Sequence, residues 1–117
     1  MAEWQFGLKD VEARLPDDPA KLRVAVALRH GSMRCLLYAP RGADAQGVHT
    51  QDEVYIVVSG RGSFFKSGEV KPFREHDLIF VEAGAEHRFV DFSDDFAAWV
   101  VFWGPEGGEA ERVTQSR

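Results

Sequence analysis

The chain has 117 residues, of which 44% are hydrophobic and 28% charged, with a formal net charge of −5 at pH 7. This balance fits a single folded domain, and the excess of 19 acidic over 14 basic residues argues against nucleic acid as a partner. No apolar stretch is long enough to span a bilayer, so we expect no membrane partner either. The lone Cys35 excludes an internal disulfide and a thiolate zinc site. No secretory pattern opens the chain, which predicts a cytoplasmic location.

The N-terminal segment has a pattern of its own. Leu8, Val11 and Leu15 recur at helical spacing, and Pro16 ends the pattern. This predicts one short helix or turn before the rest of the fold.

From residue 22 onward, short segments rich in β-branched and aromatic residues alternate with turn-forming residues. Many short strands at this spacing predict an all-β sandwich or barrel. Segments 54–58 and 99–103 are apolar at every position instead of alternating, so we expect both of their faces to be covered. The predicted strands are 22–28, 33–38, 54–58, 63–66, 78–81, 87–92 and 96–103.

These patterns divide the chain into three parts. An N-terminal arm with the short helix covers residues 1–20, and a β-barrel covers residues 21–103. Residues 104–117 are rich in glycine and charge and poor in apolar residues, so we expect a flexible C-terminal tail there.

Three side chains near strand ends have the chemistry of metal ligands. His49 and Glu53 stand at the start of the apolar segment 54–58, and His87 follows a glycine-containing turn. Four residues of straight strand span roughly 13 Å, so His49 and Glu53 can share an ion only if the chain bends between them. Two imidazoles and one carboxylate suit iron, zinc, manganese, nickel or copper, among which the residues do not choose.

The stretch from Gly42 to Gly60 resembles the first motif of the cupin superfamily. In that motif a histidine precedes a glutamate, and a glycine follows the glutamate after six residues. His49, Glu53 and Gly60 match these three positions.

A second stretch, from His76 to Asp91, resembles the second cupin motif. Gly84 and His87 match its Gly-x-x-His pattern. The resemblance implies a jelly-roll barrel, also called a double-stranded β-helix, with a short N-terminal helix or turn ahead of it. It also implies a metal site built from His49, Glu53 and His87.

The first motif departs from the family at one ligand position. The family's first histidine falls on Gly47, which has no side chain to offer. The side-chain oxygen of Gln46 or of Gln51 is a candidate replacement.

Other residues are expected to form the pocket wall, and Glu53 has alternative roles if no metal is bound. Strand alternation places Tyr55 on the side of Glu53 and Phe89 on the side of His87, so with Gln51 they are predicted pocket-wall residues. Without a metal, Glu53 is a candidate general base, or the partner of an arginine, Arg34 or Arg88.

The resemblance implies a metal-binding cupin that acts on or binds a small organic molecule in the barrel mouth, with no reaction or substrate assigned. The alternatives are a ligand-binding or sensing module without turnover, and a dimeric scaffold without metal. The resemblance also implies a homodimer, for which the two-sided strands and the Trp4-Gln5-Phe6 segment offer apolar surface.

Overall fold

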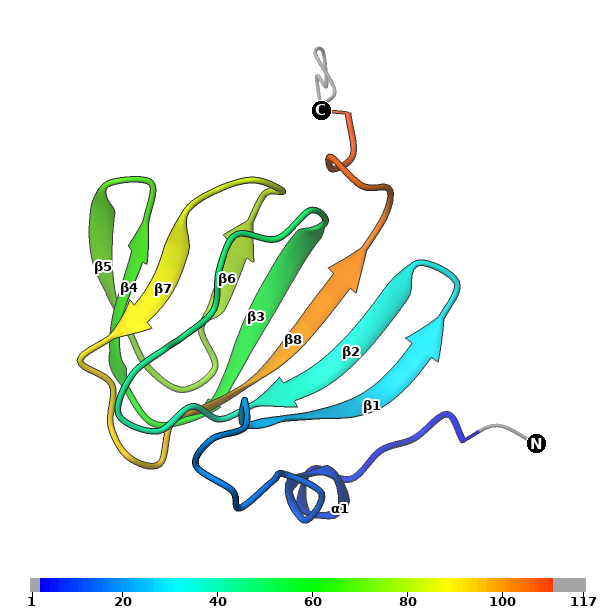
Figure 1. Cartoon of the computed structure of the whole chain (residues 1–117), viewed down its shortest axis with the longest axis vertical. Helices are drawn as coiled ribbons and strands as arrows, with labels where there is room; N and C mark the ends of the chain where they lie inside the picture. The colour runs from blue at the N-terminus through cyan, green and yellow to red at the C-terminus, as the bar shows by residue number, and fades with distance from the viewer. Residues whose placement is uncertain (1–2, 111–117) are drawn as a thin grey trace.

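The computed structural model describes residues 3–110 and is built almost entirely of antiparallel strands (Figure 1). The expected all-β class with a short N-terminal helix is confirmed. The elements are α1 (Leu8–Glu12), β1 (Val24–His30), β2 (Met33–Tyr38), β3 (Asp52–Ser59), β4 (Gly62–Lys66), β5 (Glu69–Phe73), β6 (Leu78–Val81), β7 (His87–Val90) and β8 (Ala97–Trp103).

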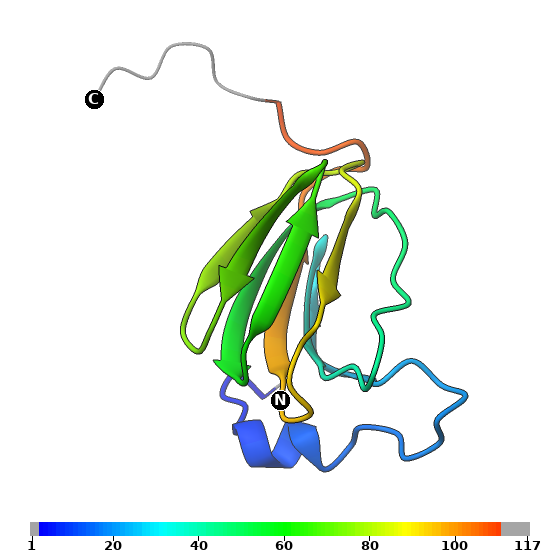
Figure 2. The same ribbon diagram turned by 90° about the vertical axis from the view of Figure 1, so that its left-hand side faces the viewer.

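The strands form two sheets that face each other. The larger sheet has the order β1-β2-β8-β3-β6, and the smaller sheet has the order β5-β4-β7. Figures 1 and 2 show the small sheet to one side of the large one, with the loop between β2 and β3 running along the molecule to reach the start of β3. The starts of β3 and β7 and the end of β8 therefore lie at one end of the molecule, the upper end in Figure 1, which we call the mouth.

The main core fills the space between the sheets. Tyr55 and Val57 of β3 pack there with Phe64 of β4 and Phe89 of β7, all of them buried. Because side chains alternate along a strand, the neighbours of these residues on β3 point to the outer face of the large sheet. That outer face carries a second core, in which Val11 and Leu15 of the α1 region pack with Leu37 and Ala97.

The outer-face core explains only part of the two-sided apolar pattern. The α1 region packs against Trp99, so the outer face of segment 99–103 is covered at its start as expected. The expectation fails for segment 54–58, where Ile56 is 38% exposed. Farther along the sheet, Leu78 and Phe80 of β6 remain 68% and 49% exposed.

One strand was absent from the sequence prediction. β5 pairs with β4 along its whole length, with Pro72 opposite Ser63. Its sequence, EVKPF, lacks strand character because it contains a proline and polar residues. Proline is tolerated there because β5 is an edge strand and donates to one neighbour only.

The described part of the predicted flexible tail is hydrogen-bonded to the mouth. The Gly107 amide donates to the Thr50 carbonyl at 2.7 Å, and the Glu109 amide donates to Asp52 Oδ2 at 2.9 Å. Backbone amides of residues 104–110 thus provide contacts with the mouth that a count of apolar residues does not register. Residues 111–117 lie outside the described residues.

Within residues 3–110, no helix has the length and apolar character needed to cross a membrane.

Candidate metal centre

The three donors predicted from the sequence meet at the mouth of the barrel. His49 lies in the loop before β3, Glu53 is the second residue of β3, and His87 is the first residue of β7. Each offers a ligand atom, and the three atoms lie within 4.8 Å of one another. The chain bends at Thr50 and Gln51 before β3 begins, as the spacing of His49 and Glu53 requires.

Backbone contacts orient the imidazole of His87. Its Nδ1 lies 2.9 Å from the carbonyl oxygen of Ala85. A carbonyl only accepts, so Nδ1 carries the proton and donates it, and in the neutral ring Nε2 presents a lone pair. This arrangement is the usual one for metal-binding histidines, because the outer hydrogen bond fixes both tautomer and ring orientation.

The lone pair of His87 faces a buried carboxylate. His87 Nε2 lies 3.0 Å from Glu53 Oε1, and both side chains are fully buried. The contact lacks hydrogen-bond geometry, so both oxygens of Glu53 and Nε2 of His87 have no hydrogen-bond partner. Two acceptors at this distance repel each other unless a proton or a cation lies between them.

A metal ion fits this arrangement. Ligands at about 2.1 Å from one ion, at right angles to one another, are about 3 Å apart, which matches the separation of Glu53 Oε1 and His87 Nε2. The third donor is slightly farther out, with His49 Nε2 at 3.9 Å from Glu53 Oε1. The donor set of two imidazoles and one carboxylate is one that leaves coordination positions open.

The two histidines differ in electrostatic environment. Burial lowers the pKa of His49, and the positive charge of Arg34 adds to that effect while Glu53 opposes it. Burial acts in the same direction on His87, but its contacts with Glu53 and with the Ala85 carbonyl outweigh burial and raise its pKa. His49 therefore remains neutral at pH 7. Its Nε2 faces the amide oxygen of Gln46 at 3.2 Å, which only accepts, so this nitrogen can bind a metal only after giving up the proton that it donates to Gln46.

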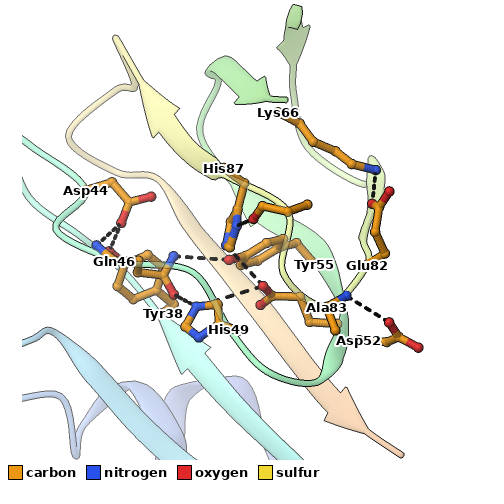
Figure 3. A network of polar contacts seen from close by, with 12 residues as sticks. Tyr38, Asp44, Gln46, His49, Asp52, Tyr55, Lys66, Glu82, Ala83 and His87 are labelled. Carbon is orange, nitrogen blue, oxygen red and sulfur yellow. Dashed lines mark hydrogen bonds and ion pairs between the residues drawn. The ribbon is translucent and has the colours of Figure 1, made fainter. Parts of the chain in front are cut away.

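A glutamine stands beside the site where the family has its first histidine. Gln46 Oε1 lies 3.2 Å from His49 Nε2, and Gln46 Nε2 donates to the Tyr55 hydroxyl at 3.1 Å. Figure 3 shows Gln46 between His49 and Tyr55. Burial, followed by the charge of Glu53, raises the pKa of Tyr55, so its hydroxyl keeps its proton.

Asp44 holds the loop that carries Gln46 and His49. Its Oδ1 accepts from the Tyr38 hydroxyl at 2.5 Å and from the Gln46 amide at 3.1 Å. Its Oδ2 accepts from the Phe89 amide of β7 at 2.8 Å. This carboxylate ties the loop to β2 and β7 at once, and Figure 3 shows its contacts with Tyr38 and Gln46. Its role was not predictable from the sequence. An aspartate in a loop has no pattern that distinguishes it from a turn residue.

Of the two glutamines predicted to replace the missing histidine, only Gln46 lies beside His49. Gln51 points away from the three donors, since its Nε2 donates to the Gly104 carbonyl at 2.8 Å and to the Ser32 carbonyl at 3.1 Å. Its Oε1 accepts from Arg34 at 3.2 Å. Gln46 is thus the amide next to His49, and Gln51 braces β2 against the end of β8.

The predicted pocket wall also separates into two parts. The Tyr55 ring lies 6.1 Å from the His87 ring, centroid to centroid. Phe89 instead packs in the aromatic core, with Tyr55, Phe64 and Phe96 around it. Phe102, which the sequence analysis assigned to core packing, lies edge-on to His49 at 5.0 Å between ring centroids.

The predicted ion pairs of Glu53 with an arginine are wrong. Arg34 bonds to Gln51, and Arg88 pairs with Glu86 at 3.3 Å. The only ion-pair partners of Glu53 among residues 3–110 are the two histidines. Strand alternation puts Arg88 on the face of β7 opposite to His87, whereas it could not exclude Arg34, which shares the face of Glu53 but donates to Gln51.

The three donors differ in exposure. Glu53 and His87 are buried, whereas the His49 side chain keeps 28% of its exposure. A cavity of about 460 Å³ lies elsewhere, between β5 and β6, and includes Phe73 and Phe80 in its wall. His49 is thus the one donor of the three that solvent reaches.

The fold and the donor set define the class of protein. The family model described as "Cupin domain" matches residues 36–103, and the chain belongs to this family. The match covers β3 to β8 completely and residues 36–38 of β2, and it leaves out β1.

Similar proteins have been found both as sequences and as structures. The uncharacterized protein SCO3923 of Streptomyces coelicolor is 38% identical over 104 residues, which cover 86% of this chain and 96% of that protein. A Cupin 2 conserved barrel domain protein from Salinispora arenicola is 22% identical, covers 89% of this chain and 91% of its own, and has a TM-score of 0.67. A double-stranded β-helix protein from Klebsiella pneumoniae has a TM-score of 0.70 at 16% identity, with 87% and 90% covered. At these identities the two structures establish the fold alone.

Proposed function

We propose that this cupin binds one divalent transition-metal ion through His49, Glu53 and His87 and uses it to bind or transform a small organic molecule. The observation that carries the proposal is the buried Glu53 carboxylate, whose two oxygens and the facing His87 Nε2 lack hydrogen-bond partners. Burying such groups without partners is costly, and an ion bound between them would offset that cost.

Each residue has a distinct task in this proposal. When bound, the ion would act as a Lewis acid or a redox centre with open coordination positions. Glu53 supplies the negative charge, and His87 is held in the ligating tautomer by the Ala85 carbonyl. The Tyr55 hydroxyl, which accepts a hydrogen bond from Gln46, keeps its proton and is a hydrogen-bond donor next to the site.

The first test is elemental analysis of the protein purified without chelators and again after incubation with each candidate metal. We expect about one equivalent of one metal per chain, and its loss in His87→Ala. His30→Ala is the matched control, because His30 is exposed at the end of β1. Wild-type protein that holds no metal after reconstitution would overturn the proposal.

A metal-free reading is the second candidate, and the 3.0 Å contact between Glu53 and His87 favours it. Here a protonated His87 and the Glu53 carboxylate would form a buried ion pair, and the protein would bind a ligand without turnover. A screen of metabolites by thermal shift separates binding from catalysis, because a ligand that stabilises the protein and is recovered unchanged is not a substrate.

A homodimer is also proposed, with a second copy covering the exposed outer face of β3 and β6. Ile56, Leu78 and Phe80 lie there with substantial exposure, in cross-strand neighbour positions. The pairing of like faces about a two-fold axis is the commonest form of self-association.

A further inference from the structure

One row of residues runs across the inner face of the large sheet at the mouth. Arg29 of β1 is opposite Arg34 of β2, and Arg34 is opposite Phe102 of β8. Phe102 is opposite Glu53 of β3. Residues directly opposite each other in antiparallel strands point to the same face, so the two arginines share the face of the metal ligand Glu53.

Arg34 lies close to the proposed metal site. With strands about 4.8 Å apart, the backbones of Arg34 and Glu53 are about 10 Å apart across β8. The Phe102 ring lies between them: its centroid is 4.5 Å from Arg34 Cζ and 5.0 Å from the His49 ring centroid. The guanidinium therefore stacks on the ring that also contacts His49, the exposed member of the donor set.

The positive charge in this row has no neutralising partner in the protein. Among the ion pairs of residues 3–110, none includes Arg29 or Arg34. Arg34 donates to the amide oxygen of Gln51, which uses one of the five N–H groups of a guanidinium. Like charges directly opposite each other in a sheet are destabilising, and the chain as a whole is acidic.

We infer that the molecule bound at the metal centre carries a carboxylate, and that Arg34, assisted by Arg29, holds this carboxylate at the edge of the mouth. The inference rests on the proposed metal site and adds a substrate class to it. A guanidinium matches a carboxylate in shape and charge, with two parallel hydrogen bonds. Its stacking on Phe102 fixes the plane in which those bonds form, and Gln51 anchors one edge. A molecule with one end on the ion and a carboxylate a few atoms away satisfies both sites.

The test compares small dicarboxylates with their diamides. Protein reconstituted with Co²⁺ is titrated with oxalate, malonate and succinate and with oxamide, malonamide and succinamide. Calorimetry gives the dissociation constants, and the visible spectrum of the cobalt centre reports whether the ion is retained and contacted. We expect at least one dicarboxylate to bind about tenfold or more tightly than its diamide, because hydrogen bonds to charged groups are among the stronger ones.

Variants locate that preference at Arg34. We expect Arg34→Gln to keep its Co²⁺ and to weaken dicarboxylate binding by about tenfold or more, with a smaller loss in Arg34→Lys. Arg29→Gln should act in the same direction with a smaller effect. Arg88→Gln is the matched control, because the Arg88 guanidinium stacks on Phe65 with Cζ at 4.3 Å from the ring centroid and lies on the face of β7 opposite to His87.

The two proposals fail in different ways. If wild-type protein takes up no Co²⁺, the proposed function fails. If it takes up Co²⁺ but binds no dicarboxylate, or binds acids and diamides equally, the carboxylate inference is overturned and the metal site stands. Equal dicarboxylate binding by Arg34→Gln and wild type also overturns it.

Discussion

The two faces of the large sheet place charged and apolar side chains in opposite ways. On the inner face at the mouth, the charged Glu53 is completely buried. On the outer face of the neighbouring strand β6, Leu78 is 68% exposed. Each is the reverse of what burial by hydrophobicity favours. The buried charge is the basis of the proposed ion site on one face, and the exposed large apolar side chains are the basis of the proposed contact with a second copy on the other.

The outer face itself has a covered and an open half. Around α1, Val11 and Leu15 are buried against Leu37, so this half belongs to the fold. In the open half, Leu78 and Phe80 stay largely exposed, and Phe80 contacts only Trp103 and Lys66 among the described aromatic and cationic side chains. The comparison predicts that substitutions in the covered half affect stability, those in the open half affect assembly, and those on the inner face affect metal binding.

The largest effect is expected from Glu53→Gln on the inner face. We expect metal affinity to fall by more than about 100-fold, beyond the usual effect of losing a partner outside the ligand set. In chelator-treated protein the melting temperature should not fall, because the substitution removes an uncompensated buried charge. Glu75→Gln, at an exposed position, is the matched control for both measurements.

The stability measurement distinguishes the metal site from a buried ion pair. If Glu53 is instead paired with a protonated His87, the substitution leaves a buried charge unpaired and costs about 3–5 kcal/mol in chelated protein. Such a loss, without any metal in the wild type, would favour the metal-free reading.

Asp44→Ala should release the loop that carries His49 and Gln46. Because three hydrogen bonds to Asp44 are lost, we expect the free energy of unfolding to fall by about 2–4 kcal/mol and metal affinity to fall about tenfold. Chemical denaturation and chelator competition measure the two effects. Asp17→Ala, at an exposed position, should change neither. Unaltered metal affinity in a destabilised Asp44→Ala protein would show that the loop does not position His49.

The covered and open halves of the outer face are compared by Val11→Ala and Leu78→Ala. We expect Val11→Ala to lower the free energy of unfolding by about 1–3 kcal/mol. Leu78→Ala should change it by less than about 0.5 kcal/mol in the monomer. Denaturation at low protein concentration measures both, and similar losses would contradict the division of the face.

Phe80→Glu tests whether a second copy covers the open half. We expect wild type to be a dimer by light scattering at micromolar concentration, and the variant to be a monomer with unchanged metal content. The charge would be desolvated in a dimer at a cost that the remaining contacts do not offset. A monomeric wild type would remove the dimer proposal and leave the metal site untouched.

The smallest effect is the pH dependence of metal affinity. Protons and metal compete for the same imidazole nitrogens. Burial lowers the pKa of His87, but its contacts with Glu53 and the Ala85 carbonyl outweigh this and raise it above its usual value. As the pH is lowered, metal affinity should therefore begin to fall at a pH above the usual imidazole pKa of about 6.5. Below the pKa of His87, the affinity should fall by up to tenfold per pH unit.

The contribution of His49 enters at lower pH. Burial lowers its pKa, so its proton competes only in more acidic solution. Competition with a chromophoric chelator across this range measures both steps. A metal affinity of the wild type that does not change with pH across this range would contradict ligation by His87.

The sequence was sufficient to predict the class of fold and the positions of most strands. Strand 33–38 and strand 78–81 have the predicted bounds, because turn-forming residues and short apolar runs are local signals. Gly60 was recognised from the first motif, and the structure gives the physical reason for a glycine there: a Cβ at this position would come within 2.6 Å of Phe96 Cα. The three donors were also predictable, since their spacing around such turns is characteristic of cupins.

Only the tertiary structure decided which neighbours those donors have. It placed Gln46 beside His49 and Gln51 away from it, put Arg34 and Glu53 in one row across three strands, and attached residues 104–110 to the mouth. These facts depend on cross-strand register and on side-chain reach between segments distant in the chain. Periodicity assigns a residue to a face, but the pairing of strands determines which residues on that face meet.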